Sequence, residues 1–284
     1  MHANRSTFRV KKMAEVLSVS ESGYYSWAKR LARGPGQKAR ERDDLRTKIF
    51  EIFIENKGVY GSRKITHALQ KKHKLAVNHK RVENILRDVG LKSRVPKKYR
   101  ATTNSKHNFP VSPNILSRQF EADRPNQKMV SDITYIPTDE GWLYLASIMD
   151  LCGRKIVGVA MGSTMTKELV IRALNDTVSR TGRINDCILH SDQGSQYCSY
   201  AYQNLLAAYG FKSSMSRKGN CWDNAPMECF WGKLKQEWLS EQHFKTREEA
   251  KAAVFEYIWI FYNRRRIHAS NGYMTPEEYY SLAA

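Results

Sequence analysis

The pattern of apolar residues between residues 126 and 240 constrains the fold more than any other feature of the sequence. Three consecutive segments rich in β-branched and aromatic residues, 130–136, 142–150 and 155–162, predict a meander of strands. An alternation of helix and strand follows, with segments at 166–180, 187–190, 199–209, 211–215 and a last helix after residue 220. This order of elements predicts an α/β fold, a mixed sheet flanked by helices.

Three carboxylates occupy distinctive places in these predicted elements. Asp132 lies in the middle of a strand, Asp192 directly follows the end of another, and Glu228 lies in the first turns of the last helix. Two carboxylates about 4 Å apart at an effective dielectric near 20 repel by roughly 4 kcal/mol, so three converging acids need a cation. The alternative is that they are separate surface acids, since most Asp and Glu side chains are exposed.

Oxygen ligands on short side chains suit Mg²⁺ or Mn²⁺ better than zinc, which prefers His and Cys. Two such ions can activate a hydroxyl nucleophile and stabilise the leaving oxygen of a phosphoryl displacement. We therefore interpret Asp132, Asp192 and Glu228 as candidate catalytic residues and as ligands of two Mg²⁺ or Mn²⁺ ions. Such chemistry needs no covalent enzyme intermediate, so no Ser or Tyr nucleophile is expected.

Charge is distributed unevenly along the chain. Residues 1–110 contain 27 Lys and Arg against 9 Asp and Glu, whereas residues 111–284 contain 20 against 19. Almost all of the net charge of +19 therefore belongs to the first part of the chain. A partner rich in phosphate explains this segregation better than general solubility does, so we expect the amino-terminal part to bind double-stranded DNA.

The basic part contains two helix-turn-helix-like units. The first, residues 1–35, has helical patterns at 10–17 and 21–30, with Ser20 placed to cap the second helix. The second, residues 36–98, has a long helix near 40–56 and two shorter helices, and the one starting near Asn78 is the candidate recognition helix. The candidate DNA contacts in the second unit are Arg63, Lys64, His79, Lys80 and Arg81. A helical bundle without DNA contacts is the competing interpretation, and residues 99–125 are predicted to be a basic linker.

The last core helix has two predicted faces. At 100° per residue, Met227, Trp231, Leu234 and Trp238 form one apolar stripe. Lys235 follows Glu228 by two turns, so an adjacent face presents an acid to metal and a lysine to a DNA phosphate. Lys235 could instead be a solvated surface lysine. Arg217 and Lys218, in the loop before this helix, are further candidate DNA contacts.

Composition also favours an intracellular protein. No run approaches 18 apolar residues and no signal-peptide pattern opens the chain, so we expect a soluble, intracellular protein without a membrane partner. The five cysteines include no Cys-x-x-Cys pair, which argues against a disulfide framework and a structural zinc site.

Several motifs together resemble one family. Three blocks look like its catalytic motifs: Ser131-Asp132-Ile133-Thr134-Tyr135, His190-Ser191-Asp192-Gln193-Gly194 and Asn224-Ala225-Pro226-Met227-Glu228. Further similarity lies upstream in Tyr60-Gly61-Ser62-Arg63 and downstream in Tyr262-Asn263, Arg265-Arg266, His268 and Thr275-Pro276. The chain resembles the second-reading-frame transposases (DDE transposases) of copy-out, paste-in bacterial insertion sequences, which have a ribonuclease-H-like, integrase-type catalytic core.

The resemblance implies a catalytic core at 126–240 and a helical extension at 241–284. It also implies metal-dependent DNA cleavage and strand transfer by Asp132, Asp192 and Glu228, with Lys235 as the family's basic residue after the glutamate. The active complex would contain several copies of the chain and the upstream-reading-frame product, usually as a frameshifted fusion. The resemblance also implies a nucleoid-associated protein of the bacterial cytoplasm. The sequence departs from the family at Met129, Ala269 and Asn271, where Trp, Ser and Leu are usual.

Two other functions remain open from the sequence. One is a ribonuclease-H-type nuclease that cuts without joining strands, and the other is a non-catalytic DNA-binding regulator of transposition. His190 also has two interpretations, since it could orient Asp192 or simply be a satisfied histidine at a strand end.

Overall fold

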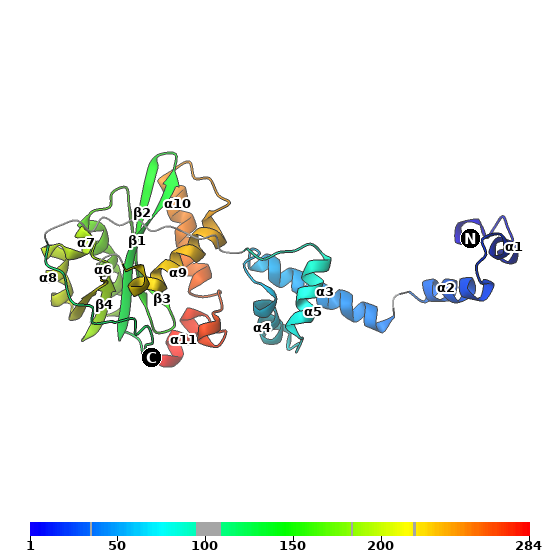
Figure 1. Ribbon diagram of the computed structural model, residues 1–284, viewed down its shortest axis with the longest axis horizontal. Helices are drawn as coiled ribbons and strands as arrows, with labels where there is room; N and C mark the ends of the chain where they lie inside the picture. The colour runs from blue at the N-terminus through cyan, green and yellow to red at the C-terminus, as the bar shows by residue number, and fades with distance from the viewer. Residues whose placement is uncertain (35, 95–108, 183, 218–219) are drawn as a thin grey trace. The chain divides into compact units, whose positions relative to one another are not determined.

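The computed structural model describes residues 1–34, 36–94, 109–182, 184–217 and 220–284. They form two compact units, Met1–Lys92 and Ser93–Ala284. Figure 1 colours both units along the chain. Among the described residues, no helix combines the length and the apolar character needed to span a membrane.

The first unit is all-helical, as the sequence predicts. Its elements are the short 3₁₀ turn η1 (His2–Asn4) and the helices α1 (Val10–Val16), α2 (Glu21–Arg33), α3 (Gln37–Glu55), α4 (Ser62–His73) and α5 (His79–Asp88). Ser20 caps α2 by accepting a hydrogen bond from the Gly23 backbone, and Asn78 caps α5 by accepting one from Lys80. Both cap residues satisfy backbone donors that the first helical turn leaves without a partner.

An apolar core joins α3, α4 and α5. The side chains that fill it are all buried and recur at helical spacing: Leu45, Ile49, Ile52 and Phe53 from α3, Ile65 and Leu69 from α4, and Val82, Ile85 and Leu86 from α5. The inward face predicted for the two shorter helices is therefore confirmed. Burial of this stripe leaves the polar faces of α4 and α5 outside the core.

The second unit is built on a five-stranded sheet. Its strands are β1 (Lys128–Thr138), β2 (Gly141–Asp150), β3 (Lys155–Gly162), β4 (Cys187–Ser191) and β5 (Phe211–Met215). They lie in the order β3-β2-β1-β4-β5. The first three strands form an antiparallel meander, while β4 pairs parallel to β1 and β5 parallel to β4. The predicted mixed α/β sheet is therefore confirmed.

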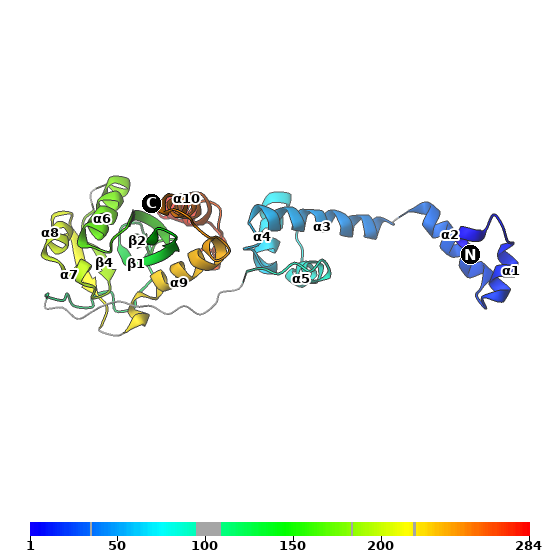
Figure 2. The same cartoon turned by 90° about the horizontal axis from the view of Figure 1, so that it is seen from above.

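Helices cover both faces of this sheet, as Figure 2 shows with α6 and α8 on one side and α9 and α10 on the other. The helices and turns of the unit are α6 (Lys167–Thr181), α7 (Ser195–Cys198), α8 (Tyr200–Ala208), η2 (Cys221–Asn224), α9 (Ala225–Leu234), η3 (Lys235–Leu239), α10 (Arg247–Phe255), η4 (Glu256–Tyr262), η5 (Ala269–Asn271) and α11 (Pro276–Ala283). Alternation along the strands supplies the two apolar faces.

Helix α6 lies unusually close to the sheet at Gly158 on β3. A Cβ atom at this position would lie 1.9 Å from the Thr177 hydroxyl oxygen and 2.6 Å from the Ala173 carbonyl oxygen. Both atoms belong to α6. The absence of a side chain at Gly158 therefore sets how closely the helix packs on the strand.

Helix α9 does not continue as a regular α-helix. At Lys235 it passes into the π-helical turn η3, and the carboxylate of Glu237 in that turn is buried. The guanidinium of Arg266 donates two hydrogen bonds to this carboxylate, and the Tyr257 hydroxyl donates a third over 2.9 Å. This buried ion pair fixes the end of the α9–η3 segment to the carboxy-terminal part of the chain.

Candidate active site

The parallel register of β1 and β4 places two of the three predicted acids side by side. Val130 on β1 is the partner of His190 on β4, and this pair is the last between the two strands. Asp132 and Asp192 each lie two residues beyond it, so both are at equivalent positions on neighbouring strands. Neighbouring strands are about 4.8 Å apart, and side chains two residues apart point to the same face. The sheet therefore brings Asp132, in the middle of β1, beside Asp192, which directly follows the end of β4.

Each aspartate is held by local hydrogen bonds. One oxygen of Asp132 accepts from its neighbour, the Ile133 backbone N–H, at 2.8 Å, and the other accepts from the indole N–H of Trp231 at 3.0 Å. Asp192 accepts from the Gly194 backbone N–H at 2.9 Å, as a turn residue does directly after a strand. These bonds set the direction of both carboxylates while leaving acceptor capacity on each of them.

Trp231 also sets the position of the third acid. It lies three residues after Glu228 on α9, so the two side chains lie on neighbouring parts of one helix face. The contact from Trp231 to Asp132 therefore holds the face that carries Glu228 against β1. The predicted apolar stripe is confirmed, since Met227, Trp231, Leu234 and Trp238 are all buried.

The pKa values of Asp132 and Glu228 are both raised. Burial raises the pKa of Asp132 well above its usual range, the charge of Asp192 raises it further, and Glu228 adds a smaller effect. Burial also raises the pKa of Glu228. Among the described residues, no three Asp, Glu, His or Cys side chains lie close enough together to enclose a metal ion. The charge of Asp192 therefore acts on Asp132 more strongly than the charge of Glu228 does.

The chemistry of this donor set fits a divalent cation. Two half-buried carboxylates on adjacent strands repel each other, and a bound cation is the partner that lets both stay ionised. The donors are oxygen atoms on short side chains, the kind that Mg²⁺ and Mn²⁺ prefer. The residues present therefore suit the magnesium or manganese expected from the sequence.

Lys235 lies beside the acids without joining them. Its ammonium is 5.0 Å from the centre of the Tyr135 ring, a cation–π distance, and the side chain is half-buried. Burial lowers the pKa of Lys235 to about 8, and the charge of Asp132 opposes that change. Lys235 also lines a cavity of about 780 Å³ together with Arg94, Tyr135 and Trp142.

The amino-terminal DNA candidates lie on α4 and α5. Arg63, Lys80 and Arg81 are exposed, whereas Lys64 and His79 are half-buried. The ammonium of Lys64 lies 5.1 Å from the centre of the Tyr60 ring. Three of the five side chains expected to face outward are thus exposed, and DNA contact by all five stays a prediction.

Two polar residues in front of α9 were not singled out from the sequence. The side-chain amide of Asn224 donates a 3.0 Å hydrogen bond to the backbone carbonyl of Ser131, next to Asp132. Asp223 is completely buried and accepts from Arg217, the candidate DNA contact in the preceding loop. Lys218, the second loop candidate, lies outside the described residues. The sequence signal for Asn224 is its place at the start of the motif that ends in Glu228, and Asp223 directly precedes that motif.

His190 is a satisfied histidine. Its two ring nitrogens lie 2.8 Å from the Ser214 hydroxyl and 3.0 Å from the Ser216 hydroxyl, and burial lowers the pKa of His190 to about 4. Both of its nitrogens therefore serve the pairing of β4 with β5 instead of contacting Asp192. Of the two interpretations of His190, the structure supports the second.

Family models match two parts of this chain. Integrase core domain models match residues 122–221 and 228–282, and an HTH-like domain model matches residues 40–99. The structure of a simian T-cell lymphotropic virus intasome with a PP2A regulatory subunit is similar with a TM-score of 0.48 and 15% identity, over 78% of this chain and 70% of that one. The HTLV-2 integrase catalytic core in complex with magnesium is similar with a TM-score of 0.43 and 17% identity, over 55% and 97%.

Curated relatives are much more similar in sequence. An uncharacterized 31 kDa protein of insertion element IS600 from Shigella sonnei is 43% identical over 96% of this chain and 100% of that protein. Transposase InsF for insertion sequence IS3A from Escherichia coli (strain K12) is 39% identical over 97% of this chain and 95% of InsF. The chain therefore belongs to the family of insertion-sequence transposases that have an HTH-like domain and an integrase core domain.

Proposed function

We propose that this protein is a DDE transposase that cleaves DNA at the ends of an insertion sequence and joins those ends to another DNA strand. In the joining step, the freed 3′-hydroxyl attacks a phosphodiester of that strand. The observation that carries the proposal is the parallel register of β1 and β4, which pairs Asp132 with Asp192 beside the helix of Glu228. These are the three acids that the family resemblance assigns to catalysis. Family membership by sequence supports the same activity.

Asp132 and Asp192 would hold one Mg²⁺ or Mn²⁺ ion, and Glu228 would complete the site of a second. When bound, such ions lower the pKa of an attacking hydroxyl and neutralise the charge of the leaving oxygen. The protein's own residues orient this chemistry. Trp231 and the Ile133 backbone direct Asp132, and the Gly194 backbone directs Asp192.

DNA would be bound mainly by the first unit. Its excess of Lys and Arg suits a polyphosphate, and its exposed Arg63, Lys80 and Arg81 lie on the two helices of the helix-turn-helix-like pair. We further propose that the active complex contains several copies of the chain, since joining two element ends requires two sites. An upstream-reading-frame product, present as a partner or as a frameshifted fusion, belongs to the same proposal, as does action on nucleoid DNA in the cytoplasm.

The test is an end-joining assay on labelled element ends with Mg²⁺, with and without the upstream product. Asp132→Asn, Asp192→Asn and Glu228→Gln should each abolish strand transfer and leave DNA binding within a few-fold of the parent. Asp176→Asn, on α6, serves as a matched carboxylate control. Joining by any of the three variants would overturn the assignment.

The same assay separates the two other functions. Cleavage of RNA–DNA hybrids without any joining of DNA ends would favour a ribonuclease-H-type nuclease. A non-catalytic regulator would be favoured if the Asp132→Asn variant retained every effect of the parent on transposition in cells.

A further inference from the structure

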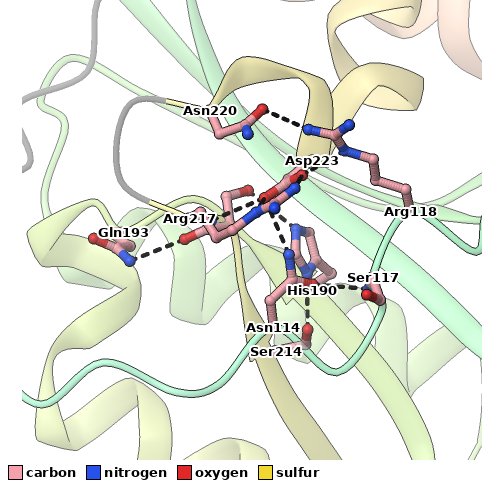
Figure 3. Close-up of polar contacts among 10 residues, drawn as sticks. Asn114, Ser117, Arg118, His190, Gln193, Ser214, Arg217, Asn220 and Asp223 are labelled. Atoms are coloured by element: carbon pink, nitrogen blue, oxygen red, sulfur yellow. Dashed lines mark hydrogen bonds and ion pairs between the residues drawn. The ribbon is translucent and has the colours of Figure 1, made fainter.

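Asp223 is the centre of a polar cluster beside the candidate active site (Figure 3). Its side chain is completely buried, in the turn η2 directly before α9. One carboxylate oxygen accepts from the Arg118 guanidinium at 2.7 Å and from Arg217 at 2.9 Å. The other accepts from Asn114, from the Arg217 backbone N–H and from the Arg217 guanidinium, each at 3.0 Å. Every acceptor position of this buried carboxylate is thus in use.

The two arginines differ from the carboxylate in exposure. The side chain of Arg118 is 44% exposed and that of Arg217 is 59% exposed. Arg217 donates through Nε and Nη2, while Arg118 donates through Nε to Asp223 and through Nη2 to the Asn220 side chain. Among the described residues, neither Nη1 group has a hydrogen-bond partner. Each guanidinium is therefore held in a fixed plane with one edge still open to solvent.

The cluster is tied to both catalytic segments. On one side, the Ser214 hydroxyl binds the backbone N–H groups of Ile115 and Leu116 and contacts the His190 ring, two residues before Asp192. Gln193, next to Asp192, donates to the Ser216 carbonyl directly before Arg217. On the other side, Asp223 precedes Glu228 by five residues along η2 and α9. The arginines thus lie next to the segments that carry two of the acids.

The two arginines neutralise the buried carboxylate of Asp223, yet each keeps a large part of its side chain exposed. The arrangement fits a phosphate. Two guanidinium groups and one carboxylate carry a net charge of +1, and arginine forks match phosphate oxygens in shape and charge. Fixing the forks in the free protein removes the ordering cost that a flexible arginine meets on binding.

We propose that Asp223 is a positioning residue that holds Arg118 and Arg217 as a preorganised clamp for a backbone phosphate of the DNA strand entering the active site. This inference rests on the proposed function for the identity of the ligand. Arg118 and Arg217 contact the phosphate, and Asp223 acts only through them. The clamp binds DNA without metal, so binding can be measured apart from strand transfer.

Replacement of Asp223 by Asn tests the proposal by the direction in which the affinity for DNA changes. It removes a negative charge at constant size, so net electrostatics alone predicts tighter binding of DNA. Preorganisation predicts weaker binding, because the two guanidinium groups lose the carboxylate that aligns them. With a short fluorescein-labelled duplex of the element end, full-length protein and EDTA, we expect the Kd of Asp223→Asn to rise about tenfold. Unchanged or tighter binding would overturn the proposal.

The arginines provide a second test that does not depend on a buried residue. Each phosphate contact contributes about 0.9 to the slope of log K against log salt concentration, so Arg118→Ala and Arg217→Ala should each lower the slope by about that amount. Arg118→Lys and Arg217→Lys retain the charge but lose the fork, so each should weaken binding while keeping most of the slope. Lys212→Ala, at the opposite end of β5 and paired with Asp186, is the charge control and should leave the slope unchanged.

Joining assays distinguish a positioning role from a merely structural one. If Asp223 acts through the clamp, Asp223→Asn raises the DNA concentration for half-maximal joining, while the rate at saturating DNA stays within a few-fold. A structural role lowers the amount of active protein and leaves the half-maximal concentration as it was, which would contradict the proposal. Absence of joining by the parent protein would instead count against the proposed function, while the EDTA binding measurements still test the clamp.

Discussion

The side-chain amide of Asn224 donates a 3.0 Å hydrogen bond to the carbonyl oxygen of Ser131, the residue before Asp132. Together with the bond from Trp231 to Asp132, this bond connects the segment that carries Glu228 to the strand that carries Asp132. It joins positions 93 residues apart in the sequence, and Asn224 itself is buried. We therefore expect Asn224 to contribute to the relative placement of these two acids without touching either of them.

Replacement of Asn224 by Ala should slow chemistry more than it weakens DNA binding. Loss of the bond lets α9 shift relative to β1, and small displacements of reacting groups are costly in rate. We expect the rate of end joining at saturating DNA to fall about tenfold, which corresponds to about 1.4 kcal/mol, with Kd for DNA within twofold. Asn175→Ala, which removes an exposed bond to Tyr209, is the control. A parental rate for Asn224→Ala would exclude this positioning role.

Lys235 should contribute to DNA binding and not to metal binding. Replacement by Ala removes an ammonium that lies over the Tyr135 ring near Asp132, but no carboxylate. We expect the salt slope of DNA binding to fall by about 0.9 and the Mg²⁺ concentration for half-maximal joining to stay constant. Lys251→Ala on α10 removes an equal charge from an exposed ion pair. If both variants behave alike, Lys235 is an ordinary surface lysine.

The first part of the chain should account for most of the affinity for DNA. A fragment of residues 1–110, which contains most of the surplus positive charge, should bind duplex DNA with a steep dependence on salt. Residues 111–284 should bind more weakly at the same ionic strength. Fluorescence anisotropy with both fragments over a range of salt concentrations makes the comparison. Equal affinities would show that the amino-terminal part does not provide most of the DNA binding.

The contact of α6 with β3 should tolerate no side chain at position 158. Gly158→Ala places a methyl group within 1.9 Å of the Thr177 hydroxyl oxygen, so α6 must move away from the sheet. We expect the free energy of unfolding to fall by about 1–3 kcal/mol. Gly232→Ala, where an added Cβ meets no atom within 4 Å, should instead stabilise α9 slightly. Urea denaturation measures both, and equal stability for the two variants would contradict the close packing at Gly158.

Asp223 should stabilise the protein in a way that depends on pH. Hydrogen bonds from the Arg217 side chain hold the pKa of Asp223 well below its usual range. Because the pKa is lowered on folding, the stabilising effect is complete above the ordinary value near 3.9 and is lost as the pH falls toward the folded-state value. The difference in unfolding free energy between the parent and Asp223→Asn should therefore shrink on acidification from neutral pH to about pH 2. A difference that stays constant would contradict the charge-assisted role of Asp223.

Local patterns predict much of this molecule. Alternating apolar residues locate the strands of the meander, and the caps at Ser20 and Asn78 mark the starts of α2 and α5. The angular positions of Met227, Trp231 and Leu234 predict the buried face of α9. All of these features depend on residues within a few positions of one another, which is the range over which periodicity and capping act.

Other features depend on distant contacts. The pairing of Val130 with His190 sets Asp132 beside Asp192, and no local pattern encodes which strands pair in parallel. The π-helical turn that begins at Lys235 departs from the spacing of 100° per residue, and its Glu237 is bound by Arg266, 29 positions away. Nothing in the sequence near Asp223 indicates that it is buried, because its partner Arg118 is 105 positions away.

The ion pair of Glu237 and Arg266 has a consequence for folding during synthesis, because Arg266 is made after the catalytic helix. The ribosome makes Asp132, Asp192 and Glu228 before it makes Arg266, so a nascent chain holds the three acids while the Glu237 carboxylate still lacks its guanidinium partner. A buried charge without its partner destabilises a fold by several kcal/mol. Polypeptides that stop short of residue 266, such as those from a gene copy broken near its end, should therefore not retain a stable catalytic helix. A decaying insertion sequence would then leave behind fragments that do not cut the chromosome of their host.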